Sequence, residues 1–308
     1  MMFKMKQVII TGADGFIGSY TVDYFLLKGV RVLALDVYDK PRKTRDNPLL
    51  TYRKCNVENT HELEEVIADQ TYDAFIHFAW AGTSGILRED YNLQIKNALT
   101  TVECLKIANK NGCPRFIVAG SIMEREVEAV IHMQGSNPSM GYIYGMGKHI
   151  AHCLCKSIAS ALDIELIWGI ITNAYGEGEE SPRFINTTIR KIINGEQLTF
   201  TEATQNYDFI HVEDVARAFY LISKNGKPFC EYLIGSSKAR PLREYIIEME
   251  KELAPSIKPI FGEVPFEGVN LPLSAFDTSE IENDCQFHAS IPFDKGVRRL
   301  FCWLNDSE

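Results

Sequence analysis

The chain lacks the sequence features that mark several classes of protein. No apolar run is long enough to cross a membrane, and the start, MMFKMKQVII, has no long apolar segment of the secretory kind. None of the eight cysteines forms a CxxC pair, and only Cys153 and Cys155 lie close together. Clustered zinc ligands are therefore missing, and the scattered thiols indicate reduced core residues. We expect a cytoplasmic protein without a metal site.

Positive charge is also in short supply. The 32 Lys and Arg residues are outnumbered by 41 Asp and Glu residues, which gives a formal net charge of -9. General nucleic-acid binding depends on many contacts between Lys or Arg and phosphate, so this composition argues against it. A local basic pocket for one small anionic ligand remains compatible with the charge. The chain shows no internal repeat and no low-complexity segment.

The first half of the chain alternates short apolar runs with helical patterns. Strand, helix and strand at this rhythm predict an α/β fold in which helices cover both faces of a parallel sheet. Because parallel crossovers are right-handed, we expect a doubly wound (Rossmann) sheet. The strands are expected at 8–11, 30–36, 51–56, 74–78, 115–120 and 165–171, and the helices near 16–27, 61–68, 91–109 and 142–161.

The rhythm breaks after about Tyr175, where the polar stretch YGEGEESPRF begins. The tail beyond it is rich in proline, which indicates a smaller C-terminal substrate-binding lobe built from discontinuous segments. We predict a dinucleotide-binding domain over residues 1–172, to which residues 206–235 return. Residues 173–205 and 236–308 would then form the smaller lobe.

Three glycines in the stretch QVIITGADGFIGSY follow a predicted strand and open an apolar helix pattern. The spacing T-G-x-x-G-x-x-G in this context is typical of a dinucleotide site. Gly12 would permit the tight turn, Gly15 would let the backbone approach a pyrophosphate, and Gly18 would allow close helix–sheet packing. The helix that begins at Phe16 and Ile17 would present its free N–H groups to the phosphates.

Asp36 provides the next test, because it ends the second predicted strand 18 residues after Gly18. A carboxylate there can accept hydrogen bonds from the adenosine ribose and repels a 2′-phosphate, which favours NAD over NADP. Arg42 and Lys43 follow closely, so NADP remains open.

Tyr144 and Lys148 lie four residues apart in YGMGK, which places them on one face of a helix. Tyrosine in water titrates near pH 10. A cation one turn away favours the phenolate, which can then take a proton from an alcohol or return one to a ketone. Gly145 and Gly147 would keep this face open for cofactor and sugar.

Together these motifs resemble the short-chain dehydrogenase/reductase superfamily, in its extended branch of nucleotide-sugar epimerases, dehydratases and reductases. The resemblance covers nearly the whole chain, through TGADGFIGS, HFAWAG, NALTTVECLKIA, RFIVAGS, YGMGK, NAYGEGE and YDFIHVEDVARAF. It implies that Ser121 hydrogen-bonds the reacting oxygen and that Asn97 supports the cofactor site. It further implies adenine contacts from Asn56 and Val57. The loop of Phe78, Ala79 and Trp80 would run under the cofactor.

The resemblance also implies hydride transfer at a sugar carbon of a nucleoside-diphosphate sugar. Dehydratases of the branch carry Asp and Glu directly after the catalytic Ser or Thr, whereas Ile122 and Met123 stand here. An epimerase that keeps its NAD and a ketoreductase that uses NAD(P)H once both need the same residues. Asp36 favours a C4 epimerase, while the loop of Trp80 looks more like 4-keto-6-deoxysugar reductases. A non-catalytic dinucleotide sensor of the same fold is a further alternative.

Substrate contacts are expected in the smaller lobe. Asn173 matches a substrate-contacting Asn of the branch, and Tyr207 stands where an Arg is common before Asp-Phe. Arg183, Arg190 and Arg240 are the remaining candidates for binding the diphosphate. The sequence does not specify the nucleotide or the sugar. The helices at 91–109 and 142–161 resemble the pair that forms the dimer interface in this branch, so a homodimer is expected.

Overall fold

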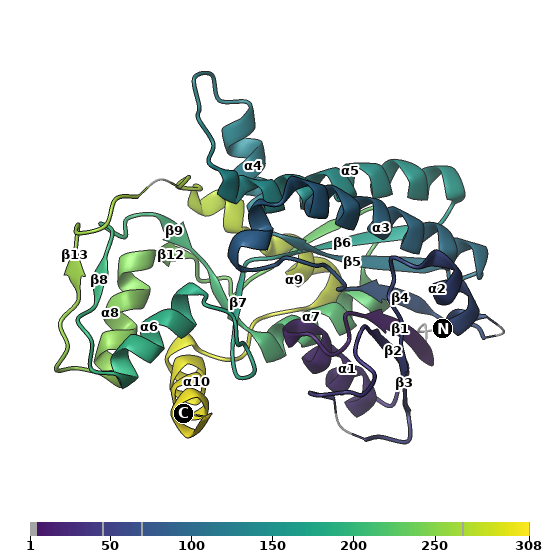
Figure 1. Cartoon of the computed structure of the whole chain (residues 1–308), viewed down its shortest axis with the longest axis horizontal. Coiled ribbons are helices and arrows are strands. Elements are labelled where there is room, and N and C mark those ends of the chain that lie inside the picture. Colours follow the sequence, from purple (N-terminus) through teal and green to yellow (C-terminus); the bar gives the residue numbers. More distant parts are fainter. Residues whose placement is uncertain (1–4, 45, 69, 267, 308) are drawn as a thin grey trace.

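A parallel sheet of seven strands forms the centre of the larger lobe, in the order β11-β6-β5-β4-β1-β2-β3 (Figure 1). The computed structural model describes residues 5–44, 46–68, 70–266 and 268–307. The strands are Gln7–Thr11 (β1), Arg31–Asp36 (β2), Leu50–Lys54 (β3), Ala74–His77 (β4), Arg115–Ser121 (β5), Glu165–Ile171 (β6) and Glu231–Ile234 (β11). The strand order reverses between β1 and β4, which confirms the doubly wound fold. Sheets of this kind bind their ligands outside the carboxyl ends of the strands at this point.

Helices cover both faces of this sheet. Because side chains alternate along a strand, Ile9 of β1 joins one core whereas Val8 and Ile10 join the other. The first core is covered by Thr60–Ile67 (α2), Tyr91–Lys110 (α3) and Ile143–Leu162 (α5). The second is covered by Phe16–Leu27 (α1), Val212–Asn225 (α7) and Ser279–Cys285 (α9).

The expected strands and helices of the first half agree with the structure to within a few residues, but one helix was not expected. Met123–Ile131 (α4) directly follows β5. Val127 and Val130 of this helix are buried against Tyr142, so its apolar side has the spacing of a helical turn. The run of glutamates in this segment hides that spacing.

The smaller lobe lies beside the larger one, at the left of Figure 1. Its core is formed mainly by three helices, Phe184–Ile193 (α6), Leu242–Leu253 (α8) and Phe293–Ser307 (α10). Its short strands are Asn173–Tyr175 (β7), Thr199–Phe200 (β8), Asn206–Tyr207 (β9), Phe209–His211 (β10), Arg240–Pro241 (β12) and Ile260–Phe261 (β13). Single 3₁₀ turns are Gly85–Glu89 (η1), Met140–Tyr142 (η2) and Leu273–Phe276 (η3).

The two lobes are interleaved along the chain. Strand β11 and helix α7 lie in the larger lobe, whereas β9 and β10, which the expected return of residues 206–235 included, lie in the smaller one. Ile281, Cys285 and Phe287 also lie in the core of the larger lobe, although the expected boundary gave them to the smaller one. Among the residues that the structure describes, no helix has the length and apolar character needed to cross a membrane.

Candidate active site

The glycine-rich turn lies between β1 and α1, and its three glycines have different roles. Gly12 has a φ of +62°, and a Cβ added to it would lie 2.7 Å from the backbone nitrogen of Ala79. A Cβ on Gly18 would lie 2.0 Å from the carbonyl oxygen of Gly12. Gly15 is exposed, and a Cβ there would meet only the same oxygen, at 3.1 Å. Packing therefore requires Gly12 and Gly18, while Gly15 leaves the outer side of the turn open to a ligand.

Helix α1 begins at this turn with its N-terminal N–H groups available. Gly15 is the N-cap residue, no side chain caps this end, and the first turn contains no acidic residue. The N–H groups near Phe16 and Ile17 and the positive end of the helix dipole suit the pyrophosphate of a dinucleotide. The residues present at this turn therefore fit the cofactor that the sequence predicts.

Asp36 lies at the carboxyl end of β2 and is 9% exposed. Its Oδ2 accepts a hydrogen bond from the backbone of Asp14 at 2.9 Å, and its Oδ1 accepts one from the backbone of Val37 at 2.8 Å. A carboxylate has about four acceptor positions, so Asp36 can still accept hydrogen bonds from ribose hydroxyls.

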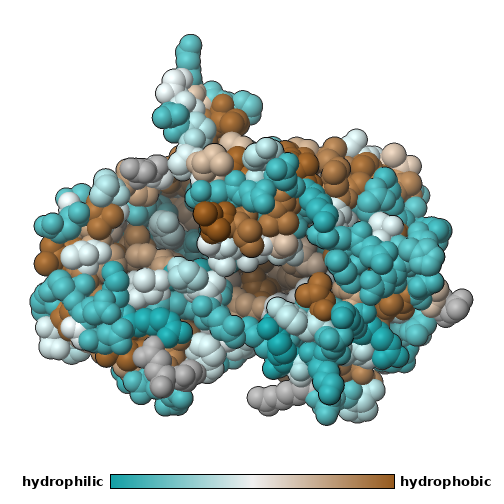
Figure 2. Space-filling view, in the orientation of Figure 1, coloured by the Kyte–Doolittle hydropathy of each residue, from teal (hydrophilic) through white to brown (hydrophobic). Residues whose placement is uncertain are grey.

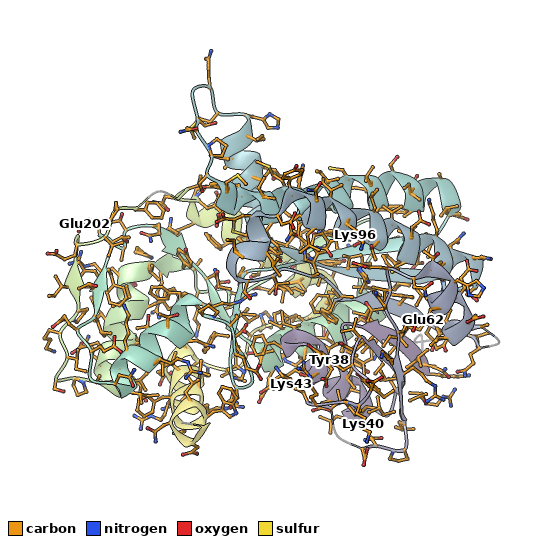
Figure 3. All side chains as sticks on the ribbon, viewed as in Figure 1. Tyr38, Lys40, Lys43, Glu62, Lys96 and Glu202 are labelled. Carbon is orange, nitrogen blue, oxygen red and sulfur yellow. The ribbon has the colours of Figure 1, made fainter. Side chains whose placement is uncertain are left out.

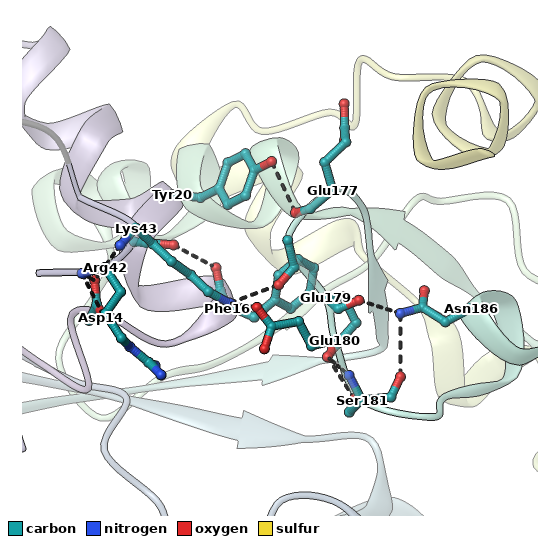
Figure 4. A network of polar contacts seen from close by, with 12 residues as sticks. Asp14, Phe16, Tyr20, Arg42, Lys43, Glu177, Glu179, Glu180, Ser181 and Asn186 are labelled. Atoms are coloured by element: carbon teal, nitrogen blue, oxygen red, sulfur yellow. Dashed lines mark hydrogen bonds and ion pairs between the residues drawn. The ribbon is translucent and has the colours of Figure 1, made fainter. Parts of the chain in front are cut away.

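Arg42 and Lys43 are the two cations for which the sequence analysis kept NADP as a possible cofactor. In the structure both bind other protein groups (Figure 4). Asp14 is fully buried and accepts hydrogen bonds from the backbone nitrogens of Arg42 at 3.0 Å and Lys43 at 2.8 Å. The Arg42 Nε also binds Asp14, at 3.1 Å, and the Lys43 Nζ donates to the carbonyl of Gly178 at 2.8 Å. These partners hold both side chains, so the site fits NAD better than a 2′-phosphate.

The loop after β4 is held by hydrogen bonds to side chains of α3. The amide of Asn97 donates to the carbonyl of Ala81 at 2.8 Å and accepts from its nitrogen at 3.1 Å. Trp80 donates from Nε1 to the buried Gln94 at 2.7 Å, and Phe78 packs against Phe219 with ring centres 4.6 Å apart. Asn97 thus holds the loop in place, and its predicted contact with the cofactor stays a prediction.

Two other residues expected at the cofactor follow β3. Asn56 is exposed, and its side chain accepts a hydrogen bond from the backbone of Glu58 at 3.1 Å. Val57 is buried in the core that α2, α3 and α5 cover. Their contacts with adenine stay predictions.

Ser121 and Tyr144 come together at the carboxyl end of the sheet. Ser121 ends β5 and Tyr144 lies in the first turn of α5, where the serine side chain is close enough to lower the pKa of the phenol. The Trp80 ring stands at 80° to the Tyr144 ring with centres 6.3 Å apart. The guanidinium carbon of Arg88 lies 4.7 Å from the centre of the Tyr144 ring. Arg88 is a site residue that the sequence analysis missed.

The charges that act on the Tyr144 phenol differ from the expectation that Lys148 favours its phenolate. Burial raises the pKa of Tyr144, and the charges of Arg183 and Arg88, in that order, oppose the rise. The Lys148 Nζ instead donates to the carbonyl of Ala119 at 2.7 Å and lies 3.8 Å from the centre of the Trp80 ring. Two arginines, and not the lysine one turn away, are therefore the cations that favour the phenolate.

Gly145 and Gly147 serve helix packing and not ligand access. A Cβ on Gly145 would lie 2.7 Å from the carbonyl oxygen of Met123 in α4, and one on Gly147 would lie 2.9 Å from the Cβ of Gln94 in α3. The expectation that they keep a face open for cofactor and sugar is wrong, because both face neighbouring helices.

Glu124 is a second residue that the sequence analysis missed. Its carboxylate is buried and accepts hydrogen bonds from the Ser121 backbone at 2.8 Å and from the Trp168 Nε1 at 3.1 Å. His152 lies within hydrogen-bonding distance of its other oxygen, at 3.3 Å. Glu124 thus fixes the backbone of Ser121, and its signal in the sequence was the glutamate-rich stretch that begins three residues after the serine.

A cavity of about 290 Å³ lies between the lobes, where Figure 2 shows the surface hollowed. The residues that line it are Thr83, Ser84, Gly85, Arg88, Asn173, Ala174, Tyr175, Glu179, Pro182, Arg183, Phe184, Ile185, Asn186, Tyr207 and Phe209. The predicted substrate residues Asn173, Arg183 and Tyr207 are in this lining. Arg190 and Arg240 are not among the described residues that line it.

Arg240 binds other residues of the smaller lobe, outside the cavity. Its guanidinium forms an ion pair with Glu248 and lies 4.1 Å from the centre of the Tyr245 ring. Asn173 donates from its amide to the carbonyl of Asp208 at 3.2 Å, which ties the start of β7 to the segment before β10. The predicted substrate contacts of these residues stay predictions.

This arrangement defines the class of protein. A parallel doubly wound sheet that presents a tyrosine and a serine beside a dinucleotide-binding turn is typical of dehydrogenase-type enzymes that move protons and hydride together. The chain belongs to the NAD dependent epimerase/dehydratase family, whose model matches residues 8–235. It is therefore an enzyme with NAD as its cofactor, which removes the non-catalytic sensor as an alternative.

Relatives and solved structures agree with this assignment. The chain is 26% identical to CDP-abequose synthase of Salmonella typhimurium over 272 residues, which cover 85% of each chain. Its fold matches UDP-glucose 4-epimerase of Thermotoga maritima, solved with UDP-glucose, with a TM-score of 0.82, 16% identity and coverage of 98% and 99% of the two chains. It also matches the enzyme WbmH of Bordetella bronchiseptica, solved with NAD+, with a TM-score of 0.79, 19% identity and coverage of 98% and 99%.

Proposed function

We propose that the protein is an epimerase that acts at C4 of a nucleoside-diphosphate hexose. The observation that carries this proposal is that Ser121 and Tyr144 lie close together beside a cavity lined by Arg88 and Arg183, with the Arg88 guanidinium against the Tyr144 ring. Such a cavity suits a substrate with one anionic end and one alcohol to be oxidised. The named epimerases and the abequose synthase among the similar proteins support the same substrate class.

Each side chain then has a defined part in the reaction. The turn at Gly15 and the N-terminus of α1 would hold NAD, which would provide the hydride chemistry at C4. Ser121 holds the C4 oxygen, and Tyr144 takes the proton of the C4 hydroxyl and returns it when the ketone is reduced from its other face. The arginines oppose the rise in the pKa of the phenol and so favour its role as a base. Arg183 and Asn173, which both line the cavity, would bind the diphosphate.

A net ketoreductase is the second candidate, and one observation favours it. Trp80 stands against Tyr144 and Lys148, and its loop looks like that of 4-keto-6-deoxysugar reductases. Such an enzyme would use the same serine and tyrosine but would consume one reduced cofactor for each 4-keto sugar.

One experiment tests both candidates. The protein is incubated with a panel of UDP-, CDP-, dTDP- and GDP-hexoses and with 4-keto sugars, each with and without added NADH. Epimerised hexose without added NADH supports the epimerase, whereas product that depends on one NADH per sugar supports the reductase. Failure to convert every member of the panel contradicts the proposal. In either active case, Tyr144→Phe should lower kcat by roughly 10²–10⁴-fold, and Tyr91→Phe, at an exposed position of α3, should not.

We also propose that the enzyme is a homodimer. Helices α3 and α5 pack against each other on one side of the sheet and carry exposed apolar side chains, which are Tyr91, Ile95, Leu99, Leu154 and Leu162. An unpartnered apolar surface on two adjacent helices supports association with a second copy.

A further inference from the structure

Arg88 stands out among the charged residues of the cavity because its side chain has no carboxylate partner. Arg183, the other arginine of the cavity, pairs with Glu179 at 3.3 Å and donates to Ser181 at 3.2 Å. Among the described residues, none forms a hydrogen bond or ion pair with the Arg88 guanidinium, which contacts the Tyr144 ring. Its five N–H donors are therefore available to a ligand.

The backbone that carries Arg88 is held in place. Gln94 is 1% exposed and donates from its amide to the carbonyls of Leu87 at 2.9 Å and Gly82 at 3.1 Å. Gly85 begins η1 with a φ of +63°, which lets the chain turn into this short segment. A buried side chain thus fixes the backbone directly before Arg88.

The charge around Arg88 is not neutralised by the protein. Glu126 of α4 is the acid that interacts with it, and burial raises the pKa of Glu126 to about 7, so this carboxyl is only partly ionised at neutral pH. Tyr207, which faces Arg88 from the smaller lobe, carries no charge at that pH, because burial raises its pKa to about 12. Of the arginines expected at the diphosphate, only Arg183 lines the cavity. The cavity thus has one cation more than its own acids balance.

We propose that Arg88 binds an anionic oxygen group of the substrate, either a phosphate of the diphosphate or a carboxylate on the sugar, and so holds the sugar against Tyr144. The planar guanidinium can donate two parallel hydrogen bonds to either group. This inference rests on the proposed function, because it assumes a nucleotide-sugar substrate. It makes Arg88 a residue that selects substrate through charge close to the reacting phenol.

Binding measurements on the NAD-bound enzyme test this role. UDP, CDP, dTDP and GDP are titrated first, followed by UDP-glucose and UDP-glucuronate, into the wild type, Arg88→Gln, Arg88→Lys and the control Arg53→Gln. Arg53 lies on the exposed edge strand β3, so its loss removes the same charge far from the cavity. We expect Arg88→Gln to weaken binding at least tenfold, Arg88→Lys to restore part of it, and Arg53→Gln to have no effect.

The outcomes separate the two anionic groups and the two proposals. Weaker binding of every ligand assigns Arg88 to the diphosphate, and weaker binding of UDP-glucuronate alone assigns it to a sugar carboxylate. Unchanged binding of all ligands to Arg88→Gln overturns the inference, and a shifted pH profile of kcat would then show that Arg88 acts only on the phenol of Tyr144. A wild-type enzyme that binds none of these ligands overturns the proposed function itself, and the inference with it.

Discussion

Lys148 shows how strongly burial changes a single side chain of this site. Lys148 is 4% exposed. Its ammonium is surrounded by protein and contacts the carbonyl of Ala119 and the face of the Trp80 ring. Burial lowers its pKa to about 7 from the 10.5 of lysine in water, and the charge of Glu124 only partly opposes this. At neutral pH the lysine therefore carries a proton only part of the time, which suits a group beside a tyrosine that must gain and lose a proton.

This shift has a consequence for stability that can be measured. The unfolded chain keeps the lysine protonated up to about pH 10.5, whereas the folded protein releases that proton near pH 7. Between these two pH values the unfolded state binds more protons than the folded state. Burying the charged lysine therefore lowers the free energy of unfolding most below pH 7, and this loss disappears as the pH rises to 10.5. We expect Lys148→Met to gain stability over the wild type by up to a few kcal/mol near pH 7, and progressively less toward pH 10.

Urea unfolding of the cofactor-free protein at pH 7, 8.5 and 10 checks this expectation. Lys96→Met is the matched control, because Lys96 is an exposed lysine of α3, labelled in Figure 3, whose partner is Glu58. Its effect on the free energy of unfolding should change little with pH over this range. A difference between Lys148→Met and the wild type that is the same at all three pH values would contradict the lowered pKa.

At the scale of elements, two loops from different lobes are joined beside the glycine-rich turn (Figure 4). The segment after β2 is fixed by the buried Asp14, and its Lys43 reaches the carbonyl of Gly178 in the loop after β7. Tyr20 of α1 adds a hydrogen bond to the carbonyl of Glu177 at 3.1 Å. Because these contacts join the larger lobe to the smaller one, they limit how far the two can separate.

We expect Lys43→Met to speed the release of NAD. Losing a partly exposed hydrogen bond worth about 1 kcal/mol should raise the dissociation rate about fivefold, as measured by stopped-flow displacement. Lys40→Met is the control, since Lys40 lies on the same loop and is exposed, and Figure 3 shows both lysines. Equal release rates for the two variants would show that the contact with Gly178 does not retain the cofactor.

The sequence predicted those elements whose signals are local. The glycine spacing, Asp36 at the end of a strand, and Tyr144 four residues before Lys148 can be read from short segments. The contact of Glu124 with Trp168 joins residues 44 positions apart, and it depends on which strands are neighbours in the sheet. Arg88 meets Tyr144 for the same reason. Gly145 and Gly147 were misjudged because local sequence does not show which helix packs against them.

At the scale of the whole molecule, the surface of α3 and α5 is the feature that a single chain does not explain. Tyr91, Ile95 and Leu99 recur every four residues on α3, and they are 61%, 39% and 54% exposed. Leu154 and Leu162 of α5 are also exposed. Figure 2 shows apolar side chains gathered over these helices at the upper right. Burying such a row between two copies would stabilise a dimer at about 25 cal/mol for each Å² of apolar surface removed from water.

Sedimentation velocity tests whether two copies of the chain associate through the surface of α3 and α5. We expect the wild type to sediment at twice the mass of the chain and the double variant Ile95→Glu, Leu99→Glu to sediment as a monomer, because two carboxylates per copy would be desolvated at the interface. Leu27→Glu is the control, since Leu27 is 76% exposed at the end of α1, away from these helices. A monomeric wild type, or a double variant that still dimerises, contradicts the proposed interface. The glycine-rich turn and Asp36 lie on the opposite side of the chain's own fold from this proposed contact, in elements β1, α1 and β2, so we expect the monomeric variant still to bind NAD.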